Sequence, residues 1–417
     1  MEINSKKMKK SAFLLLIVVV LSSCLGRGGK AQDNGKTTGS DSIVPIEVKY
    51  ATGFTVSDSA GCRLVSVGQK DRFALVHNLD TQVPDGYTKV RVPISSTICM
   101  TALQLSNFTV LNAHDVVKGI TGTKNLFNRD ILQRVDDGRI AKIGMEGEFD
   151  TELVLSAHPD VIFISPSKRG GYDAIKQTGI TLVPHLGYQE LDPLGQAEWI
   201  KLVGMFIGKE KEANEFFDGI EKRYNDLKEK VSAQQTHPQP LPAGRGEDTP
   251  FSNNQGVQGN DSPPSQGGAG GGSLPTVFSG EMHYGNWHAV GGRNYLAQIF
   301  RDAGAKYVID DAETAGEDLE FEKMYDLAAN ADYWRILNSF QGDFTYDALK
   351  ASEPRNALFK AFKEHKVIYC NMKQQPYYEI TPVEPDVLLK DFVAIFHPEL
   401  VEPDYEGKYY RLMRNEE

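Results

Sequence analysis

Cysteine is scarce in this chain, and the familiar catalytic motifs are missing. Four Cys among 417 residues are too few for a disulfide scaffold, and no CxxC pair indicates a zinc module. No GxSxG, HExxH or P-loop motif occurs, and no GxGxxG lies between a strand and a helix. The Gly267–Gly272 tract lacks the helix and the Lys that follow in a phosphate-binding loop. We therefore expect a protein that is not an enzyme.

An excess of basic charge is also absent. The formal net charge is −11, which argues against nucleic acid as a partner because phosphate binding needs concentrated Lys and Arg. The hydrophobic and aromatic contents, 40% and 10%, are ample for folded cores and exclude a wholly disordered chain. The length alone allows two or three domains.

The N-terminal residues have the pattern of a secretion signal. Four Lys precede the apolar run Ala12–Leu21, which is too short to anchor the chain across a bilayer. Leu21-Ser22-Ser23-Cys24 resembles a bacterial lipobox, so residues 1–23 are expected to be removed and Cys24 to carry a lipid. An ordinary signal peptide is the alternative. Residues 24–45 are expected to be a flexible tether, which places the protein on the periplasmic side of a bacterial membrane, anchored by its lipid.

The next part of the chain predicts a small β appendage and then an α/β lobe. In residues 46–87, the runs Ile46–Phe54, Arg63–Val67 and Arg72–Leu79 predict antiparallel strands. Residues 88–194 alternate between short apolar runs and helical segments, which is typical of a mostly parallel sheet covered on both faces. Strands are expected at Lys89–Pro93, Val110–Asn112, Arg139–Gly144, Val161–Ser165 and Ile180–Pro184, and helices at Thr97–Leu105, Phe149–Ser156 and Tyr172–Gln177.

A connecting segment and an insertion precede a second lobe. Helical spacing of apolar residues in 195–233 predicts the connecting helices, with an interruption at Gly208. Residues 234–273, rich in Gly and Pro, predict a disordered insertion, and residues 274–417 predict a second α/β lobe. Its strands are expected at Thr276–Ser279, Tyr307–Ile309, Tyr333–Leu337 and Lys366–Cys370, and its helices at Tyr295–Ala303, Phe321–Ala329, Pro354–Glu364 and Val387–Phe396.

The predicted fold class is therefore α/β, with two Rossmann-like lobes of mostly parallel sheets joined by a single long α-helix. Several segments, in their order along residues 88–400, are similar to those of one known family. They are Phe149–Ser165 with its His-Pro-Asp-Val-Ile stretch, Gly291–Tyr295, Asp302–Gly304, Asn330–Trp334, Phe359–Tyr369 and Asp386–Glu399. The chain resembles the helical-backbone (class III) periplasmic substrate-binding lipoproteins of ABC importers, which carry ferric siderophores, haem or cobalamin.

The resemblance implies a receptor that captures an iron complex (siderophore or haem) or cobalamin between two lobes. It also implies delivery to an ABC permease with its ATPase, and we expect a monomer with no intrinsic cofactor. Two features depart from the family. The positions where many members carry a docking Glu fall near Met100 and Gln298, and the 234–273 insertion has no counterpart in the family pattern.

Ligands of open α/β sheets bind beyond the carboxyl ends of the strands, and this rule selects candidate residues in both lobes. They are Ser96, Thr97, His114, Lys168, Arg169 and Tyr188 in the first lobe, and His283, Tyr284, Trp287, Arg293 and Tyr377 in the second. Aromatic faces suit a large flat or macrocyclic ligand, and Arg or Lys suit its carboxylates or phosphate. If the ligand is haem, the candidate axial residues are His283, His288 and Tyr284.

Two other classes of function stay open. A transition-metal-ion receptor would need His114, Asp115, His283 and a Glu to converge on a small closed cavity. A lipid-anchored interaction module would bind no small ligand at all.

Overall fold

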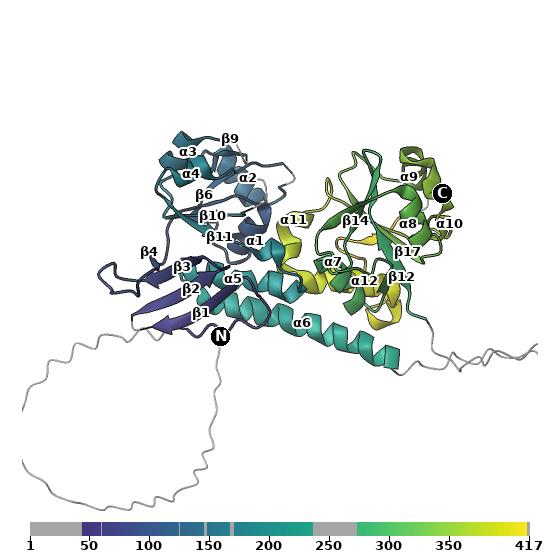
Figure 1. The fold of residues 1–417 in the computed structure, drawn as a ribbon, viewed down its shortest axis with the longest axis horizontal. Helices are drawn as coiled ribbons and strands as arrows, with labels where there is room; N and C mark the ends of the chain where they lie inside the picture. The colour runs from purple at the N-terminus through teal and green to yellow at the C-terminus, as the bar shows by residue number, and fades with distance from the viewer. Residues whose placement is uncertain are drawn as a thin grey trace, which may run out of the picture. The chain divides into compact units, whose positions relative to one another are not determined.

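The computed structural model describes residues 44–59, 61–124, 126–145, 148–166, 171–236 and 273–414 (Figure 1). The signal peptide, Cys24, nearly all of the tether and residues 237–272 of the insertion lie outside these ranges. So do Lys168 and Arg169. Within the described ranges, no helix is long and apolar enough to cross a membrane.

The β appendage is a four-stranded sheet with the order β1-β2-β3-β4. Its strands are β1 (Phe54–Ser59), β2 (Cys62–Val67), β3 (Asp71–Val76) and β4 (Thr88–Arg91). The first two pairings are antiparallel as predicted, whereas β4 runs parallel to β3. Two expectations are wrong. Residues 46–53 form no strand, because their backbone N–H groups bond to side chains of a later helix region. The run near Lys89 joins the appendage rather than the first lobe.

The N-terminal lobe contains a five-stranded parallel sheet with the order β11-β10-β5-β6-β7. The strands are β5 (Thr97–Cys99), β6 (Val117–Ile120), β7 (Ala141–Lys142), β10 (Val161–Ile164) and β11 (Thr181–Pro184). After β7, the chain forms a separate two-stranded antiparallel ladder of β8 (Gly144–Met145) and β9 (Glu148–Phe149). The helices are α1 (Ala102–Val110), α2 (Arg129–Asp136), α3 (Thr151–Ser156) and α4 (Asp173–Lys176).

Near the start of this lobe, the order of strands and helices differs from the prediction by one element. The segment 97–105, predicted as one helix, begins with strand β5, whose residues are all buried between β10 and β6. The helix starts only at Ala102, because Thr101 and Gln104 form a reciprocal capping box. Residues 110–112, predicted as a strand, are the end of α1, and the second strand begins at Val117.

Two helices connect the lobes. α5 (Pro193–Ile207) ends at Gly208, which adopts a left-handed conformation with φ of 67°, and α6 (Glu210–Thr236) follows. The left-handed residue ends a helix at little cost only when it is Gly. α6 has 27 residues and so spans roughly 40 Å. It packs on α5 and, further along, on α12 (Pro385–Phe396) of the second lobe (Figure 1).

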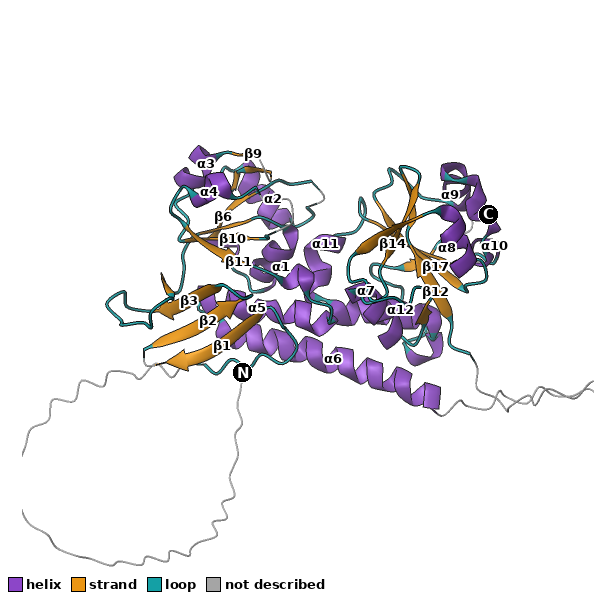
Figure 2. Cartoon of the chain, in the orientation of Figure 1, coloured by secondary structure: helices purple, strands orange, loops and turns teal. Residues whose placement is uncertain are grey.

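The C-terminal lobe contains a sheet with the order β15-β12-β17-β18-β19, parallel except for β19. Figure 2 shows helices on both sides of these strands. The strands are β12 (Thr276–Ser279), β15 (Lys306–Tyr307), β17 (Tyr333–Asn338), β18 (Val367–Asn371) and β19 (Arg411–Leu412). The remaining helices are α7 (Tyr295–Asp302), α8 (Phe321–Ala328), α9 (Tyr346–Ser352), α10 (Lys360–Lys363) and α11 (Tyr377–Ile380).

A second, antiparallel sheet in this lobe has no counterpart in the sequence prediction. Its order is β13-β14-β16, with β13 (Glu281–His283), β14 (Asn286–Val290) and β16 (Gly316–Leu319). β13 and β14 form a hairpin whose two turn residues, Tyr284 and Gly285, both have positive φ. That conformation matches the twist of the flanking strands. The mostly parallel two-lobed α/β fold is confirmed, with this hairpin added to it.

Candidate functional site

In the N-terminal lobe, a small cavity of about 110 Å³ opens at the carboxyl ends of β5 and β6. Thr101 and Ala102 line it from the start of α1, and Thr121, Gly122 and Lys124 line it from the residues after β6. The Thr121 hydroxyl donates to the carbonyl of Met100 at 3.2 Å, which joins the two strand ends. The cavity therefore lies where the open-sheet rule places ligands.

The lining of this cavity combines an apolar base with one exposed cation. Cys99 forms part of the base, and burial raises the pKa of its thiol, so it stays protonated. The Lys124 side chain is exposed, and none of the described carboxylates pairs with it. A negatively charged group brought to this edge would meet Lys124 first.

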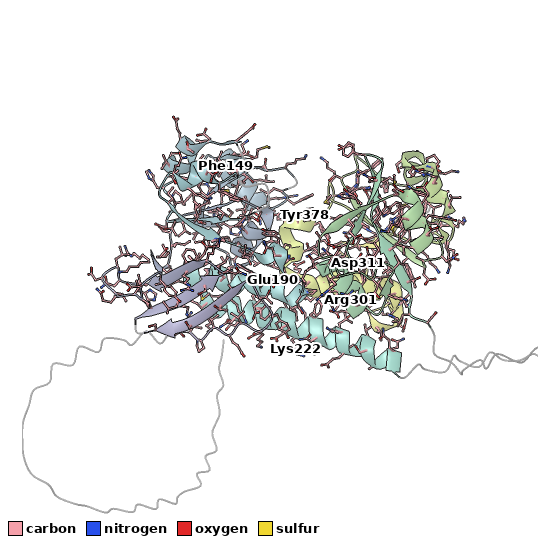
Figure 3. The ribbon with its side chains drawn as sticks, in the orientation of Figure 1. Phe149, Glu190, Lys222, Arg301, Asp311 and Tyr378 are labelled. Atoms are coloured by element: carbon pink, nitrogen blue, oxygen red, sulfur yellow. The ribbon has the colours of Figure 1, made fainter. Side chains whose placement is uncertain are left out.

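The chain just beyond Lys124 is held by a residue of the C-terminal lobe. Glu379 of α11 accepts backbone N–H groups from Phe127 at 2.6 Å and Asn128 at 2.9 Å. Glu379 is 1% exposed, and its burial raises the pKa of its carboxyl group. α11 also packs on α1, and Figure 3 labels its exposed neighbour Tyr378. The loop beside the N-terminal cavity is thus fixed to the other lobe.

In the C-terminal lobe, the β13–β14 hairpin follows directly from the carboxyl end of β12. Tyr284, at its tip, is fully exposed. The His283 and His288 rings lie edge to face with centroids 6.3 Å apart, and each His pairs with a carboxylate, Glu281 and Asp318 respectively. The hairpin therefore presents two neighbouring imidazoles, with an exposed phenol at its turn.

A polar network connects this hairpin to the ends of the neighbouring strands. Asn338, which ends β17, donates to Glu281 at 3.2 Å, and it accepts from the Tyr369 hydroxyl at 2.8 Å. Burial is the main reason that the pKa of Glu281 is raised, and burial also raises the pKa of Tyr369. Glu281 lies 3.4 Å from Nε2 of His283 and so helps to orient that ring. A larger cavity, of about 330 Å³, adjoins Tyr369 at the end of β18.

Some of the predicted site residues lie at these carboxyl edges. Tyr188 follows β11, is 40% exposed, and donates its hydroxyl to the carbonyl of Pro166, which follows β10. His283, Tyr284 and His288 lie together on the hairpin. Arg293 is exposed just before α7.

Other predicted residues lie elsewhere. Ser96 precedes β5 and His114 precedes β6, so both are at the amino ends of their strands. Thr97 and Trp287 are fully buried and have no surface with which to meet a ligand. The Thr97 hydroxyl donates to the Val161 carbonyl. The Trp287 ring packs among other aromatic side chains, and its indole N–H donates to Ser279.

Tyr377 is also nearly buried, at 8% exposed, and packs against the Tyr410 ring. Lys168 and Arg169 fall outside the described residues.

Sequence reasoning missed Thr121, Lys124, Asn338, Tyr369 and Glu379. The first two were missed because the second strand was placed seven residues too early, at 110 instead of 117. The capping box at Thr101 could have revealed the correct positions in the sequence. It marks the start of α1, and therefore shows that β5 ends just before it. Glu379 carried no signal, because its partners are backbone groups more than 250 residues away.

Comparison with known proteins finds a family model that matches part of the chain. Residues 101–261 match the profile of the periplasmic binding protein family. An uncharacterized lipoprotein of Methanocaldococcus jannaschii is 25% identical over 422 residues, which cover 96% of this chain and 97% of that protein. A second uncharacterized lipoprotein of the same organism is 25% identical over 358 residues, or 80% of this chain and 74% of the relative.

Solved structures share the fold. A periplasmic haem-binding protein from Pseudomonas aeruginosa aligns with a TM-score of 0.51 and 14% identity, over 73% of this chain and 93% of that one. The TroA-like periplasmic binding protein FepB from Veillonella parvula aligns with a TM-score of 0.51 and 16% identity, over 77% and 95%. The profile match over residues 101–261 and the two parallel-sheet lobes make the chain similar to the periplasmic binding protein family.

Proposed function

We propose that this protein is the substrate-binding component of an ABC importer and captures an iron complex, a siderophore or haem, between its two lobes. The family binds solutes for such importers. The observation that carries the proposal is that each lobe has a cavity at the carboxyl ends of its parallel strands. Open α/β sheets use that edge to bind ligands. Cobalamin, which the sequence resemblance also implies, is tested as a third ligand.

The hairpin chemistry favours a ligand that contains iron. Imidazole and phenolate are both axial ligands of haem iron in proteins, and His283, His288 and Tyr284 offer these groups at exposed positions. Glu281 beside Nε2 of His283 resembles the carboxylate partners that orient metal-binding imidazoles. The haem-binding names of solved proteins with this fold agree with an iron complex.

A bare transition-metal ion is a poorer match for the observed positions. The sequence hypothesis needed His114 and Asp115 to approach His283. His114 and Asp115 lie before β6, at the amino edge of the N-terminal sheet, and Asp115 pairs with Arg134. A complex that brings its own iron ligands needs fewer protein donors than an ion does.

The first experiment is a binding panel with the mature chain. Haem, a ferric hydroxamate, a ferric catecholate and cobalamin are titrated separately by calorimetry, and divalent metal ions are included as a fifth arm. We expect at least one iron complex to bind. Binding of metal ions alone would favour the metal receptor, and no binding in any arm would favour an interaction module and refute the proposal.

The second experiment tests the hairpin with a matched control. His283→Ala and Tyr284→Ala should weaken binding of the iron complex by roughly 2 kcal/mol if either contacts it. His77→Ala removes an exposed imidazole from the appendage and should leave affinity unchanged. Equal affinity for all three variants and the wild type would remove the hairpin from the site.

We further propose that a lipid on Cys24 anchors the mature protein at an extracytoplasmic membrane surface. The lipobox-like sequence supports this, as do the lipoprotein names of both Methanocaldococcus relatives. Cys24→Ala should release the protein from the membrane fraction and abolish incorporation of labelled fatty acid. A variant that stays lipid-labelled would show that the acceptor is another residue.

A further inference from the structure

The larger cavity lies along the outer edge of the C-terminal sheet, where β19 pairs with β18. Its volume is about 330 Å³, at the lower end of the range for small-molecule sites. Its lining includes Asp343, Phe344, Tyr369, Asn371, Arg411 and Arg414. The Phe344 and Tyr369 rings lie tilted against each other with centroids 4.9 Å apart, which gives the cavity an aromatic wall.

Hydrogen bonds at the strand ends connect the lining of this cavity to the base of the hairpin. Tyr369 faces Arg411 across the β18–β19 ladder, and directly opposed residues project from the same face of a sheet. The Tyr369 hydroxyl bonds to Asn338, which in turn bonds to Glu281 at the base of the hairpin.

The charges of the cavity are unbalanced in an otherwise acidic chain. Arg411 and Arg414 are both exposed, and neither forms an ion pair with any carboxylate of the described ranges. Arg355 and Arg223, by contrast, pair with Glu353 and Asp386, whereas Arg72 and Arg293 share the unpaired state of Arg411 and Arg414 among the described residues. Asp343 is the one carboxylate among the described lining residues.

The side-chain amide of Asn371, at the end of β18, is already committed to the protein's own backbone, whereas the two guanidinium groups are not paired with a described carboxylate. Nδ2 of Asn371 already donates to the carbonyls of Phe340 and Gly342, and its Oδ1 accepts from Lys373. Asn371 therefore shapes the wall and holds the loop after β17. The planar guanidinium fork matches the geometry of paired anionic oxygens.

We propose that Arg411, supported by Arg414, binds anionic oxygens of the solute, so that the transported complex carries net negative charge at that end. This rests on the proposed function and narrows its substrate class. An iron(III) ion held by three singly charged hydroxamates is neutral, whereas one held by three doubly charged catecholates is an anion. Haem supplies the same chemistry through its two carboxylates. Lys124, at the cavity of the other lobe, adds a cation of the same sign.

The test compares a ferric tris-catecholate, haem and a neutral ferric tris-hydroxamate, titrated by quenching of protein fluorescence at low and high salt. Arg411→Gln should weaken the binding of the anionic solute roughly 10-fold, the loss expected for a charge-assisted hydrogen bond. Arg414→Gln should have a smaller effect, and Asp343→Asn should strengthen binding severalfold. Arg72→Gln removes the same charge from the appendage, where the side chain is exposed, and should change nothing.

The outcomes separate this inference from the proposed function. If the wild type binds iron complexes but prefers the neutral one, or if Arg411→Gln and Arg72→Gln bind the anionic solute equally, the inference is wrong and the function stands. If the wild type binds none of the solutes, both are wrong. Selective loss of catecholate affinity or of haem affinity identifies which anion is used. Circular dichroism of each variant checks that the fold is retained.

Discussion

A buried carboxylate on α5 holds the first described residues of the chain against the connecting helices, and its replacement should be costly. Glu198 has a fully buried side chain. It accepts backbone N–H groups from Lys49, Tyr50 and Ala51 at 2.7–3.0 Å. It also accepts from the Lys201 ammonium at 2.8 Å, and that side chain is only 3% exposed.

The loss of unfolding free energy expected for Glu198→Gln can be worked out from the contacts that the amide cannot make. The amide keeps the shape of the carboxylate but replaces one acceptor oxygen with an NH₂ group. Both oxygens of Glu198 face donors, so either orientation of the amide points a donor at another donor. Lys201 also loses its only carboxylate partner among the described residues. Breaking a buried ion pair from one side costs about 3–5 kcal/mol.

Urea unfolding of the mature chain, followed by circular dichroism, measures this cost. Glu215→Gln is the matched control, because Glu215 on α6 is 66% exposed and lies 3.7 Å from Lys211. The control should change the unfolding free energy by less than about 0.5 kcal/mol. Combining Glu198→Gln with Lys201→Met should recover part of the loss, because the unpaired ammonium is removed. A Glu198→Gln protein within about 1 kcal/mol of the wild type would refute the reasoning.

Three further predictions concern other buried or paired groups. Trp287→Ala should destabilise the fold by about 3–5 kcal/mol in urea unfolding, because the ring is fully buried among aromatic neighbours; a small loss would contradict this core placement. The hydrogen bond to Asp311 is the main cause that raises the pKa of Glu317 to about 7. Its protonation therefore stabilises the fold below the unfolded Glu pKa of about 4.3, and this contribution is lost as the pH rises to about 7. Glu317→Gln should flatten the unfolding free energy over that interval, and an unchanged pH profile would exclude the shared proton. Glu379→Ala should cost about 1–3 kcal/mol and speed hydrogen exchange at the amides of Phe127 and Asn128, whereas unchanged exchange would show that Glu379 does not hold them.

The fold could be predicted largely from local patterns. The run Val161–Ile164 is apolar throughout and lies in the middle of a parallel sheet, as predicted. The shift at residues 97–117 arose because the three-residue strand β5 is too short to show a period and runs directly into a capped helix. The β13–β14 hairpin was missed because its turn uses Tyr-Gly rather than Asn-Gly or Asp-Gly.

The site was harder to predict than the fold, because the edge rule depends on where each strand ends. Because the first strands were predicted too early in the sequence, the rule selected Ser96 and His114, which lie at the amino ends of β5 and β6 and not at the carboxyl ends. The candidates His283, Tyr284, Trp287 and His288 lie close together in the sequence, but residues of the hairpin alternate between two faces. Trp287 points into the core, whereas Tyr284 at the turn is exposed. Alternation of this kind follows once a hairpin is recognised.

Contacts in the middle of α6 bear on how the lobes can move during capture. Glu221 pairs with Lys49, in the segment before β1, at 2.9 Å. Further along, Tyr224 and Lys228 bond to Asp302 of α7 at 2.7 and 3.0 Å. A wide hinge motion of the C-terminal lobe away from α6 would have to break buried hydrogen bonds such as Tyr224–Asp302.

The Glu379 contacts impose a second restraint on lobe movement, and this restraint does not involve α6. They join α11 of one lobe to the loop that follows Lys124 in the other. Any approach of the lobes around a solute must either keep this carboxylate on its two N–H groups or break both hydrogen bonds. The first course permits only small rotations about α11, since hydrogen bonds weaken steeply when they are bent or stretched. We therefore expect the strand ends that bind the solute to be largely preformed. Adjustments of loops and side chains at the hairpin and at Lys124 should contribute more to solute capture than movement of whole lobes.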